Sequence, residues 1–265
     1  MELSNRLQAV ADLLDCHDRI ADIGCDHGFV SIYLIESKKA SRCLAMDVNK
    51  GPLERAMEHV TEKRLSTYIE TRLSDGAKGI EFVADEDGNL RLEVEAALIA
   101  GMGGRLTIQI IKDSLDKFKS MEEFVLQPQS EINKVRHFIR EIGYHIEKEN
   151  MILEDGKFYP MMKVVRGEKM VGYTENIPVS VKIALDEGDL NIFDIQWLFD
   201  EYGEWLLKEK NQTLLQFLQK EKMLYSDILG NLEKTDTIKS ELRRKEIREK
   251  LRYIKLGLEW FEDEV

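Results

Sequence analysis

The stretch ADIGCDHGFVSIYL combines glycines with two side chains that can carry charge. Asp22 and Gly24 end an apolar run, Gly28 follows four residues later, and Asp26 and His27 stand where a nucleotide-binding turn often has another glycine. Glycine allows a sharp turn off a strand and leaves room for a ligand against the backbone. Asp26 would repel a pyrophosphate and attract a cationic sulfonium or amine. Unless it is an ordinary strand–helix turn, the loop suits S-adenosylmethionine better than NAD.

Acidic residues follow the next two strand-like runs. Asp47 lies 19 residues past Gly28, at about the distance where an acid accepts hydrogen bonds from the ribose of a nucleoside cofactor. Asp75 and Gly76 end the third run, and the acid there could accept a hydrogen bond from an adenine amine. A helix cap for Asp47 and a simple turn for Asp75 are the alternatives.

A fourth run ends in Gly101, Met102, Gly103 and Gly104. Three glycines in this stretch leave bare backbone at the carboxyl edge of a sheet, where open α/β sheets bind ligands. A flat base could lie over such a floor, so Gly103 and Gly104 are candidate substrate contacts. Because ligand-type signals stand at four successive strand ends, we expect Asp22, Gly24, Asp26, Gly28, Asp47, Asp75, Gly76, Gly101 and Met102 to bind the cofactor.

Strand-like and helical runs alternate up to about residue 166, which predicts a parallel sheet covered on both faces. The strands are expected at 19–23, 42–48, 68–75, 96–104 and 123–128, with helices at 28–39, 51–64, 105–118 and 130–143. Asp155 and Gly156 join two further extended runs, a strong hairpin signal. A doubly wound sheet that closes on an antiparallel hairpin is typical of Rossmann-like class I methyltransferases, whereas nicotinamide-binding domains normally continue in parallel.

Beyond this region the apolar residues fall at helical spacing, from about 197 to 260, with a polar break at 233–237. We expect two long helices in an antiparallel, coiled-coil-like hairpin. The predicted domains are therefore a methyltransferase domain, 1–166, and a helical domain, 167–265.

The stretch 239–255 is locally basic, with eight Lys or Arg against three Glu, a local charge of +5. Its candidate nucleic-acid contacts are Arg243, Arg244, Lys245 and Arg248. A solvated helix face with i,i+4 ion pairs explains the same pattern, and the apolar stripe could be a dimer seam.

Composition limits the alternatives. The 265 residues carry a net charge of −12, which on its own argues against a nucleic-acid partner. The three cysteines form no CxxC pair, so we expect a reducing cytoplasm and no metal site. The acidic, amphipathic N-terminus is not a secretory signal, and no apolar run is long enough to span a membrane.

Five motifs together carry a family resemblance: ADIGCDHG, the acid in AMDVNKGPLERA, LSDGAKGI, IAGMGG and LQPQ. They resemble the bacterial tRNA (adenine-22-N1)-methyltransferases, and the tail WLLKEKN…FLQKEK resembles the helical C-terminal domain of that family. The resemblance covers nearly the whole chain. It implies methyl transfer from S-adenosylmethionine to N1 of adenine 22 in the D-loop of tRNA.

For that reaction Asp26 and His27 are the candidate catalytic residues. Asp26 could stabilise the cationic product base or hold the methionine amine, and His27 could orient the base or take a proton from its N6 amine. Tyr159 and Pro160 could line the base side of the site. A monomer that binds tRNA is favoured.

Two other functions stay open. The first is a methyltransferase for a small molecule or protein, with the helical hairpin as a dimer or partner interface. The second is a binding module that senses S-adenosylmethionine without turnover. A nicotinamide dehydrogenase fits least, because Asp26 and the Asp155-Gly156 hairpin both oppose it.

Overall fold

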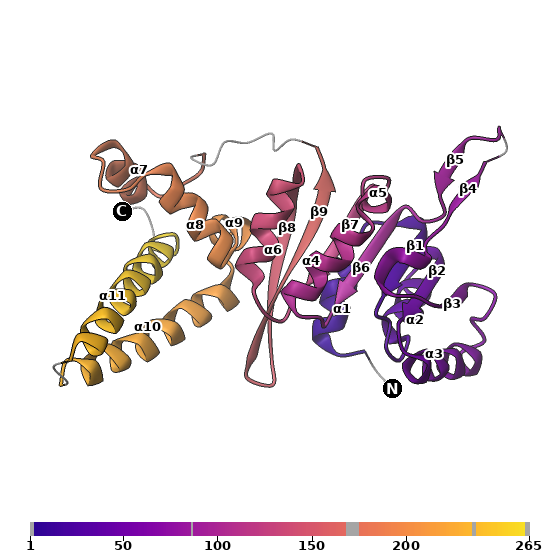
Figure 1. Ribbon diagram of the computed structural model, residues 1–265, viewed down its shortest axis with the longest axis horizontal. Coiled ribbons are helices and arrows are strands. Elements are labelled where there is room, and N and C mark those ends of the chain that lie inside the picture. The colour runs from indigo at the N-terminus through magenta and orange to yellow at the C-terminus, as the bar shows by residue number, and fades with distance from the viewer. Residues whose placement is uncertain (1–2, 86, 168–174, 235–236, 263–265) are drawn as a thin grey trace. The chain divides into compact units, whose positions relative to one another are not determined.

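The computed structural model describes residues 3–85, 87–167, 175–234 and 237–262 (Figure 1). The chain divides into two compact units, which comprise residues 1–169 and 170–265. Residues 168–174, just after the domain boundary expected from the sequence, lie outside the described residues.

A seven-stranded sheet forms the first unit, with the strand order β3-β2-β1-β6-β7-β9-β8. The first five run parallel, whereas β9 is antiparallel to both β7 and β8. The strands are β1 (His17–Ile23), β2 (Ala40–Asp47), β3 (Ile69–Leu73), β6 (Ala96–Ala100), β7 (Glu123–Gln127), β8 (Tyr144–Glu154) and β9 (Lys157–Arg166). The Rossmann-like methyltransferase sheet expected from the sequence is confirmed.

The antiparallel hairpin turns at Asp155 and Gly156. Both residues have positive φ, 49° and 74°, and Glu154 pairs with Lys157 across the turn. A two-residue loop needs such angles to match the twist of the strands, and Asp-Gly supplies them at low steric cost. The hairpin expected at this dipeptide is therefore confirmed.

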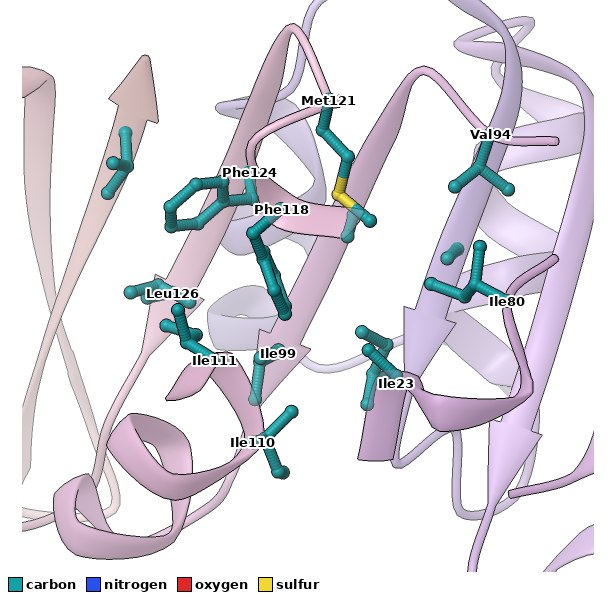
Figure 2. Packing of buried hydrophobic residues seen from close by; sticks show 14 of the residues in the cluster. Ile23, Ile80, Val94, Ile99, Ile110, Ile111, Phe118, Met121, Phe124 and Leu126 are labelled. Carbon is teal, nitrogen blue, oxygen red and sulfur yellow. The ribbon is translucent and has the colours of Figure 1, made fainter. Parts of the chain in front are cut away.

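Helices cover both faces of the sheet (Figure 1). Neighbouring strand residues alternate between two cores, as Leu98 and Ile99 do on β6, because side chains point to opposite faces of a strand. One core packs α1 (Asn5–Asp12), α2 (Phe29–Glu36) and α3 (Lys50–Glu62). The other packs the 3₁₀ turn η1 (Gly76–Gly79), α4 (Gly104–Asp113), α5 (Leu115–Phe118) and α6 (Ile132–Glu141); Figure 2 shows part of it.

Two details differ from the sequence-based expectation. The fourth strand ends at Ala100 rather than continuing to 104, because Gly101 has a φ of +79° and leaves the extended conformation. The helix expected at 105–118 is two helices, α4 and α5, interrupted at Ser114. The interruption turns Phe118 into the core, where it packs edge-on against Phe124.

A second, two-stranded sheet was not expected. It pairs β4 (Phe82–Ala84) with β5 (Leu90–Leu92), three residues each. Strands this short with mostly exposed side chains give no clear alternation in the sequence. Glu93, just after β5, anchors this hairpin to the main sheet.

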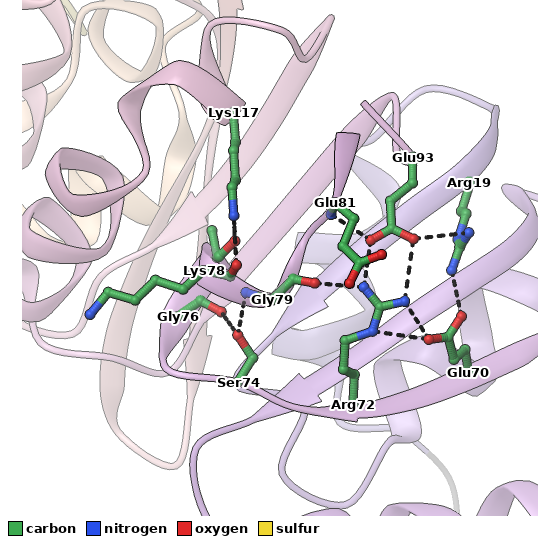
Figure 3. Close-up of polar contacts among 11 residues, drawn as sticks. Arg19, Glu70, Arg72, Ser74, Gly76, Lys78, Gly79, Glu81, Glu93 and Lys117 are labelled. Carbon is green, nitrogen blue, oxygen red and sulfur yellow. Dashed lines mark hydrogen bonds and ion pairs between the residues drawn. The ribbon is translucent and has the colours of Figure 1, made fainter. Parts of the chain in front are cut away.

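The carboxylate of Glu93, whose side chain is 4% exposed, lies between two arginines (Figure 3). Its oxygens lie 2.5 Å from Arg72 Nη1 and 3.2 Å from Arg19 Nη1, and one oxygen also accepts the backbone N–H of Glu81 at 2.7 Å. Burial alone would raise the pKa of Glu93, but the Arg72 and Glu81 hydrogen bonds outweigh burial and hold it below its ordinary range. The network joins β1, β3 and the small hairpin.

The second unit is helical. Its elements are α7 (Val179–Asp186), α8 (Ile192–Tyr202), α9 (Glu204–Lys208), α10 (Gln212–Leu232) and α11 (Ile238–Glu259). Asn211 caps α10 by accepting the N–H groups of Thr213 and Leu214, and Thr237 caps α11. The expected polar break does separate the two long helices, although its residues 235–236 lie outside the described residues.

The two long helices pack antiparallel: Arg244 near the start of α11 donates to the carbonyl of Leu232 at the end of α10, and Gly257 near the end of α11 lies against Leu218 in the first half of α10. Leu214 and Leu218 of α10 are buried, whereas Met223 and Leu224 are exposed. A regular coiled-coil seam stays a prediction. No helix in the described part of the chain is long and apolar enough to cross a membrane.

We expect Glu93→Ala to lower the free energy of unfolding by about 2–3 kcal/mol, because it removes the less exposed of the two carboxylates that Arg19 and Arg72 share and leaves them only Glu70, which is about half exposed. Urea denaturation of the purified protein measures the change. Glu81→Ala is the matched control, since it removes an exposed carboxylate and keeps the backbone N–H that binds Glu93. Equal stability of the two variants would contradict the role of Glu93.

Candidate functional site

A cavity of about 520 Å³ opens at the carboxyl ends of the parallel strands. It lies where strand order reverses between β1 and β6, the place where open α/β sheets bind ligands. The sequence-predicted residues that line it are Asp22, Gly24, Asp26, His27, Asp47, Asp75, Gly76, Gly101 and Met102. The fold thus brings all four strand-end signals to one cavity.

The turn after β1 depends on glycine for two different reasons. Gly24 has a φ of +80°, and a Cβ built on it would lie 2.1 Å from the Met102 Cε, so the two strand-end loops touch. Gly28 has a φ of +73° and is the N-cap residue of α2. A Cβ on Gly28 would lie 3.0 Å from the Ala56 Cβ on α3. Gly28 therefore lets two helices pack and does not itself line the cavity.

Asp22 is a buried carboxylate at the base of the cavity, 2% exposed. Its Oδ2 accepts a hydrogen bond from the Ser31 hydroxyl at 2.6 Å. Burial raises the pKa of Asp22 to about 6, and the Ser31 hydrogen bonds offset only part of that rise. A cation bound in the cavity would favour the ionised form of this carboxylate.

Asp26 and His27 stand at the rim. Asp26 has a φ of 48°, and its carboxylate is two-thirds exposed. The Asp26 Oδ1 lies 3.6 Å from the His27 Nε2, and both residues line the cavity.

An aromatic stack beside His27 was not predicted. The His27 ring centroid lies 5.8 Å from that of Phe29, which stacks on His59 at 4.6 Å. The His59 Nδ1 donates to the His27 carbonyl oxygen at 2.9 Å. This contact joins α3 to the loop, and only the pairing in space reveals it, because His59 is 32 residues away.

Asp47 and Asp75 end neighbouring strands. The Asp47 Oδ1 accepts the backbone N–H of Asn49 at 2.8 Å, which leaves the other carboxylate oxygen for a ligand. The Asp75 carboxylate is exposed and lies 2.5 Å from the Lys78 Nζ. Gly76 has a φ of +60°, and a Cβ there would lie 3.0 Å from Ile110, so this glycine also brings α4 close.

The loop after β6 is joined to the loop after β7. The Gln129 N–H donates to the Met102 carbonyl at 2.8 Å, and the Gly104 N–H donates to the Ser130 carbonyl at 3.0 Å. A Cβ on Gly104 would lie 2.3 Å from that Ser130 oxygen, and one on Gly103 would lie 3.2 Å from the Ser130 hydroxyl. Gly103 and Gly104 thus allow the loops to meet and do not line the cavity.

Arg6 of α1 lines the cavity and was missed by sequence reasoning. Its Nη1 donates to the Gln127 Oε1 at 2.6 Å, and the same oxygen accepts the Gly101 N–H at 3.2 Å. The Arg6 guanidinium lies over the Tyr159 ring, 5.0 Å from its centroid. Tyr159 does not line the cavity itself; it supports a residue that does. Pro160 is buried on β9.

The basic candidates of α11 belong to the second unit. Arg243 pairs with Glu246 at 2.7 Å and Arg248 with Glu233 at 3.3 Å, and Lys245 is exposed. Arg244 is half-buried, with its Nη1 on the Leu232 carbonyl at 3.0 Å. Three of the four candidates can therefore turn outward, while Arg244 also holds the hairpin together.

Comparisons with known proteins agree with this geometry. A family model described as a methyltransferase domain matches residues 3–162. A Bacillus subtilis (strain 168) tRNA (adenine(22)-N(1))-methyltransferase is 29% identical over 259 residues, 96% of each chain. The crystal structure of the B. subtilis tRNA methyltransferase TrmK is 27% identical, with a TM-score of 0.74 over 97% of this chain and 99% of that one. A Streptococcus pneumoniae structure in complex with S-adenosyl-L-methionine is 26% identical, with a TM-score of 0.75 over 97% and 100%.

We expect Asp22→Asn to change how stability depends on pH. Folding raises the pKa of Asp22 from 3.8 to about 6, so its ionisation costs the folded state stability as the pH rises between these values. The variant lacks that loss, so it should match the wild type near pH 4 and exceed it by about 1–3 kcal/mol at pH 7. Denaturant unfolding across this range measures the difference. The stability of Asp116→Asn, a change at an exposed position, should depend on pH as that of the wild type does. If the stability of Asp22→Asn ran parallel to that of the wild type across this pH range, the raised pKa of Asp22 would not be the cause.

Proposed function

We propose that this chain, which belongs to the methyltransferase-domain family, transfers a methyl group from S-adenosylmethionine to N1 of adenine 22 in tRNA. The observation that carries the proposal is the single cavity lined by Asp26, Asp47, Asp75 and Gly101. The B. subtilis relative, similar over nearly its whole length, supports the choice of acceptor.

The cavity fits S-adenosylmethionine in size and charge. Its volume of about 520 Å³ lies within the usual range for small-molecule sites. In our assignment Asp47 holds the ribose hydroxyls, Asp75 faces the adenine amine, and Asp22 with Asp26 favours the cationic end of the cofactor. Gly101 and Met102 supply the surface against which the cofactor lies. The cofactor brings an electrophilic methyl group on a positively charged sulfur.

The residues around the acceptor need only position it. Adenine N1 has an in-plane lone pair that is largely unprotonated at neutral pH, so no general base has to generate the nucleophile. Alignment of N1 with the methyl group can contribute several kcal/mol to the rate. The methylated base is cationic, and the exposed Asp26 carboxylate can stabilise that charge as it develops. His27, beside it, orients the base.

The tRNA has to be held outside the cavity as well. The target base must leave its stack, which costs a few kcal/mol that contacts elsewhere must supply. Arg243, Lys245 and Arg248 are exposed along α11, and we assign phosphate contacts to them. We assign the enzyme to the cytoplasm, which agrees with its three free cysteines and with a tRNA substrate, and we propose that it acts as a monomer.

The test is methyl transfer from labelled S-adenosylmethionine to unmodified bulk tRNA, followed by digestion and nucleoside analysis. We expect label in 1-methyladenosine. Label in another nucleoside would mean that the enzyme methylates a different atom. Cofactor binding with no labelled RNA would favour a small-molecule or protein methyltransferase, or a sensor that binds without turnover.

Asp47→Asn should weaken binding of S-adenosylhomocysteine by about 10- to 100-fold, because an amide accepts hydrogen bonds from a ribose diol less strongly than a carboxylate does. Isothermal titration calorimetry measures this change directly. Asp116→Asn, an exposed carboxylate on α5, is the control and should bind as the wild type does. Unchanged affinity in Asp47→Asn would remove this residue from the ribose site.

Replacing Arg243, Lys245 and Arg248 together by Gln should weaken tRNA binding and lower the slope of log K against log salt by about 2–3. Filter binding at several salt concentrations measures the slope, and affinity for S-adenosylhomocysteine should stay unchanged.

The control variant neutralises three exposed cations of the first unit, Arg42, Arg91 and Lys148. If both triple variants had the wild-type salt slope, α11 would not hold the RNA, and the helical hairpin would instead be a protein interface.

A further inference from the structure

We infer that Gln129 recognises the acceptor adenine through its N6 amine and N7, and so leaves N1 free to attack the methyl group. The inference rests on the proposed function and adds a specificity-determining residue to it. Gln129 lies in the LQPQ stretch, to which sequence reasoning assigned no role in the site.

Gln129 is fixed in the cavity beside the loop after β6. It follows β7 directly after Pro128 and lines the cavity. Its backbone N–H donates to the Met102 carbonyl at 2.8 Å, which fixes its position against the glycine loop. A Cβ built on Gly101 would lie 3.8 Å from the Gln129 Nε2, so the carboxamide lies beside the bare backbone at that residue.

The carboxamide is free to bind a ligand. Gln129 is exposed to the cavity, and within the described residues no hydrogen bond to its side-chain amide is formed. Two other polar side chains of the cavity already have partners: Arg6 binds Gln127, and Asp22 binds Ser31.

A second carboxamide, Asn49, also lines the cavity. It lies two residues after Asp47, where its backbone N–H binds the Asp47 carboxylate. Asn49 is therefore placed at the ribose end of the cofactor in our assignment. Gln129 is the carboxamide beside the loop after β6, and we place the acceptor base there.

Hydrogen-bond chemistry then selects one edge of adenine. A carboxamide offers one N–H donor and one carbonyl acceptor in parallel, and adenine can match this pair in two ways. Pairing with N6 and N1 would occupy the nucleophile. Pairing with N6 and N7 leaves N1 free, and it is the arrangement by which glutamine reads adenine in nucleic acids.

The same pair discriminates against guanine. Guanine presents two acceptors at this edge, O6 and N7, so the Gln129 carbonyl would face an oxygen without a proton between them. A site that leaves a polar group unpaired rejects the wrong base more strongly than one that only misses an apolar contact. Gln129 would thus add base selection to a cavity in which Asn49, the other carboxamide, lies beside Asp47.

The experiment compares two tRNAs, one with adenosine and one with 7-deazaadenosine at the acceptor position. The second lacks only the N7 acceptor and keeps N1 and N6. For the wild type we expect kcat/KM to fall about tenfold with the deaza substrate, the loss typical of one base-edge hydrogen bond. Gln129→Ala should be slower on adenosine and should show little further loss with 7-deazaadenosine.

Two controls separate this role from misfolding. Gln129→Ala should bind S-adenosylhomocysteine as the wild type does. Gln109→Ala, on the exposed side of α4 where the side chain bonds to Asp113, should keep the full deaza penalty.

The outcomes distinguish the inference from the proposed function. An equal deaza penalty in wild type and Gln129→Ala, or no penalty in the wild type, would overturn the role of Gln129 while methyl transfer itself stands. No methyl transfer by the wild type to the adenosine tRNA, with cofactor binding intact, would overturn the proposed function and this assignment with it.

Discussion

Parallel pairing of β1 with β6 is the constraint on which the site depends. Ile23 lies beside Ile99 in this pairing, so both strands end at the same edge, and the strand order reverses between them. The helices that follow, α2 and α4, pack on opposite faces of the sheet, and the space between their starts becomes the cavity. Gly24 and the Met102 side chain come so close there that a side chain at position 24 would collide with the Met102 Cε.

Charge in this protein acts locally rather than through the net value of −12. The cavity gathers carboxylates, which suit a cationic cofactor and a base that becomes cationic. The basic run of α11 is partly neutralised by its own partners, since Arg243 lies near Glu246, Arg248 near Glu233 and Lys250 near Glu201. A polyanion that binds this helix must compete with those ion pairs, which favours a transient, salt-sensitive complex.

Much of the fold could be predicted because its signals are local. The alternation of strand and helix, the Asp155-Gly156 turn and the acids at strand ends each occupy a few consecutive residues. Side-chain partners far apart in sequence could not be predicted, such as Arg6 with Gln127 across 121 residues or Arg72 with Glu93 across 21. The glycines were ambiguous for a physical reason. Gly24 and Gly101 border the cavity, whereas Gly28 and Gly104 make room for a neighbouring helix or loop. The sequence alone does not show whether a glycine makes room for a ligand or for another part of the chain.

The most direct test of the account is primer extension on one tRNA after incubation with the purified protein and S-adenosylmethionine. Methylation of N1 blocks the pairing edge of adenine and therefore stops a reverse transcriptase. The account predicts a cofactor-dependent stop at nucleotide 22, absent when that nucleotide is guanosine. Full-length extension with both tRNAs, or a stop at another nucleotide, would contradict it.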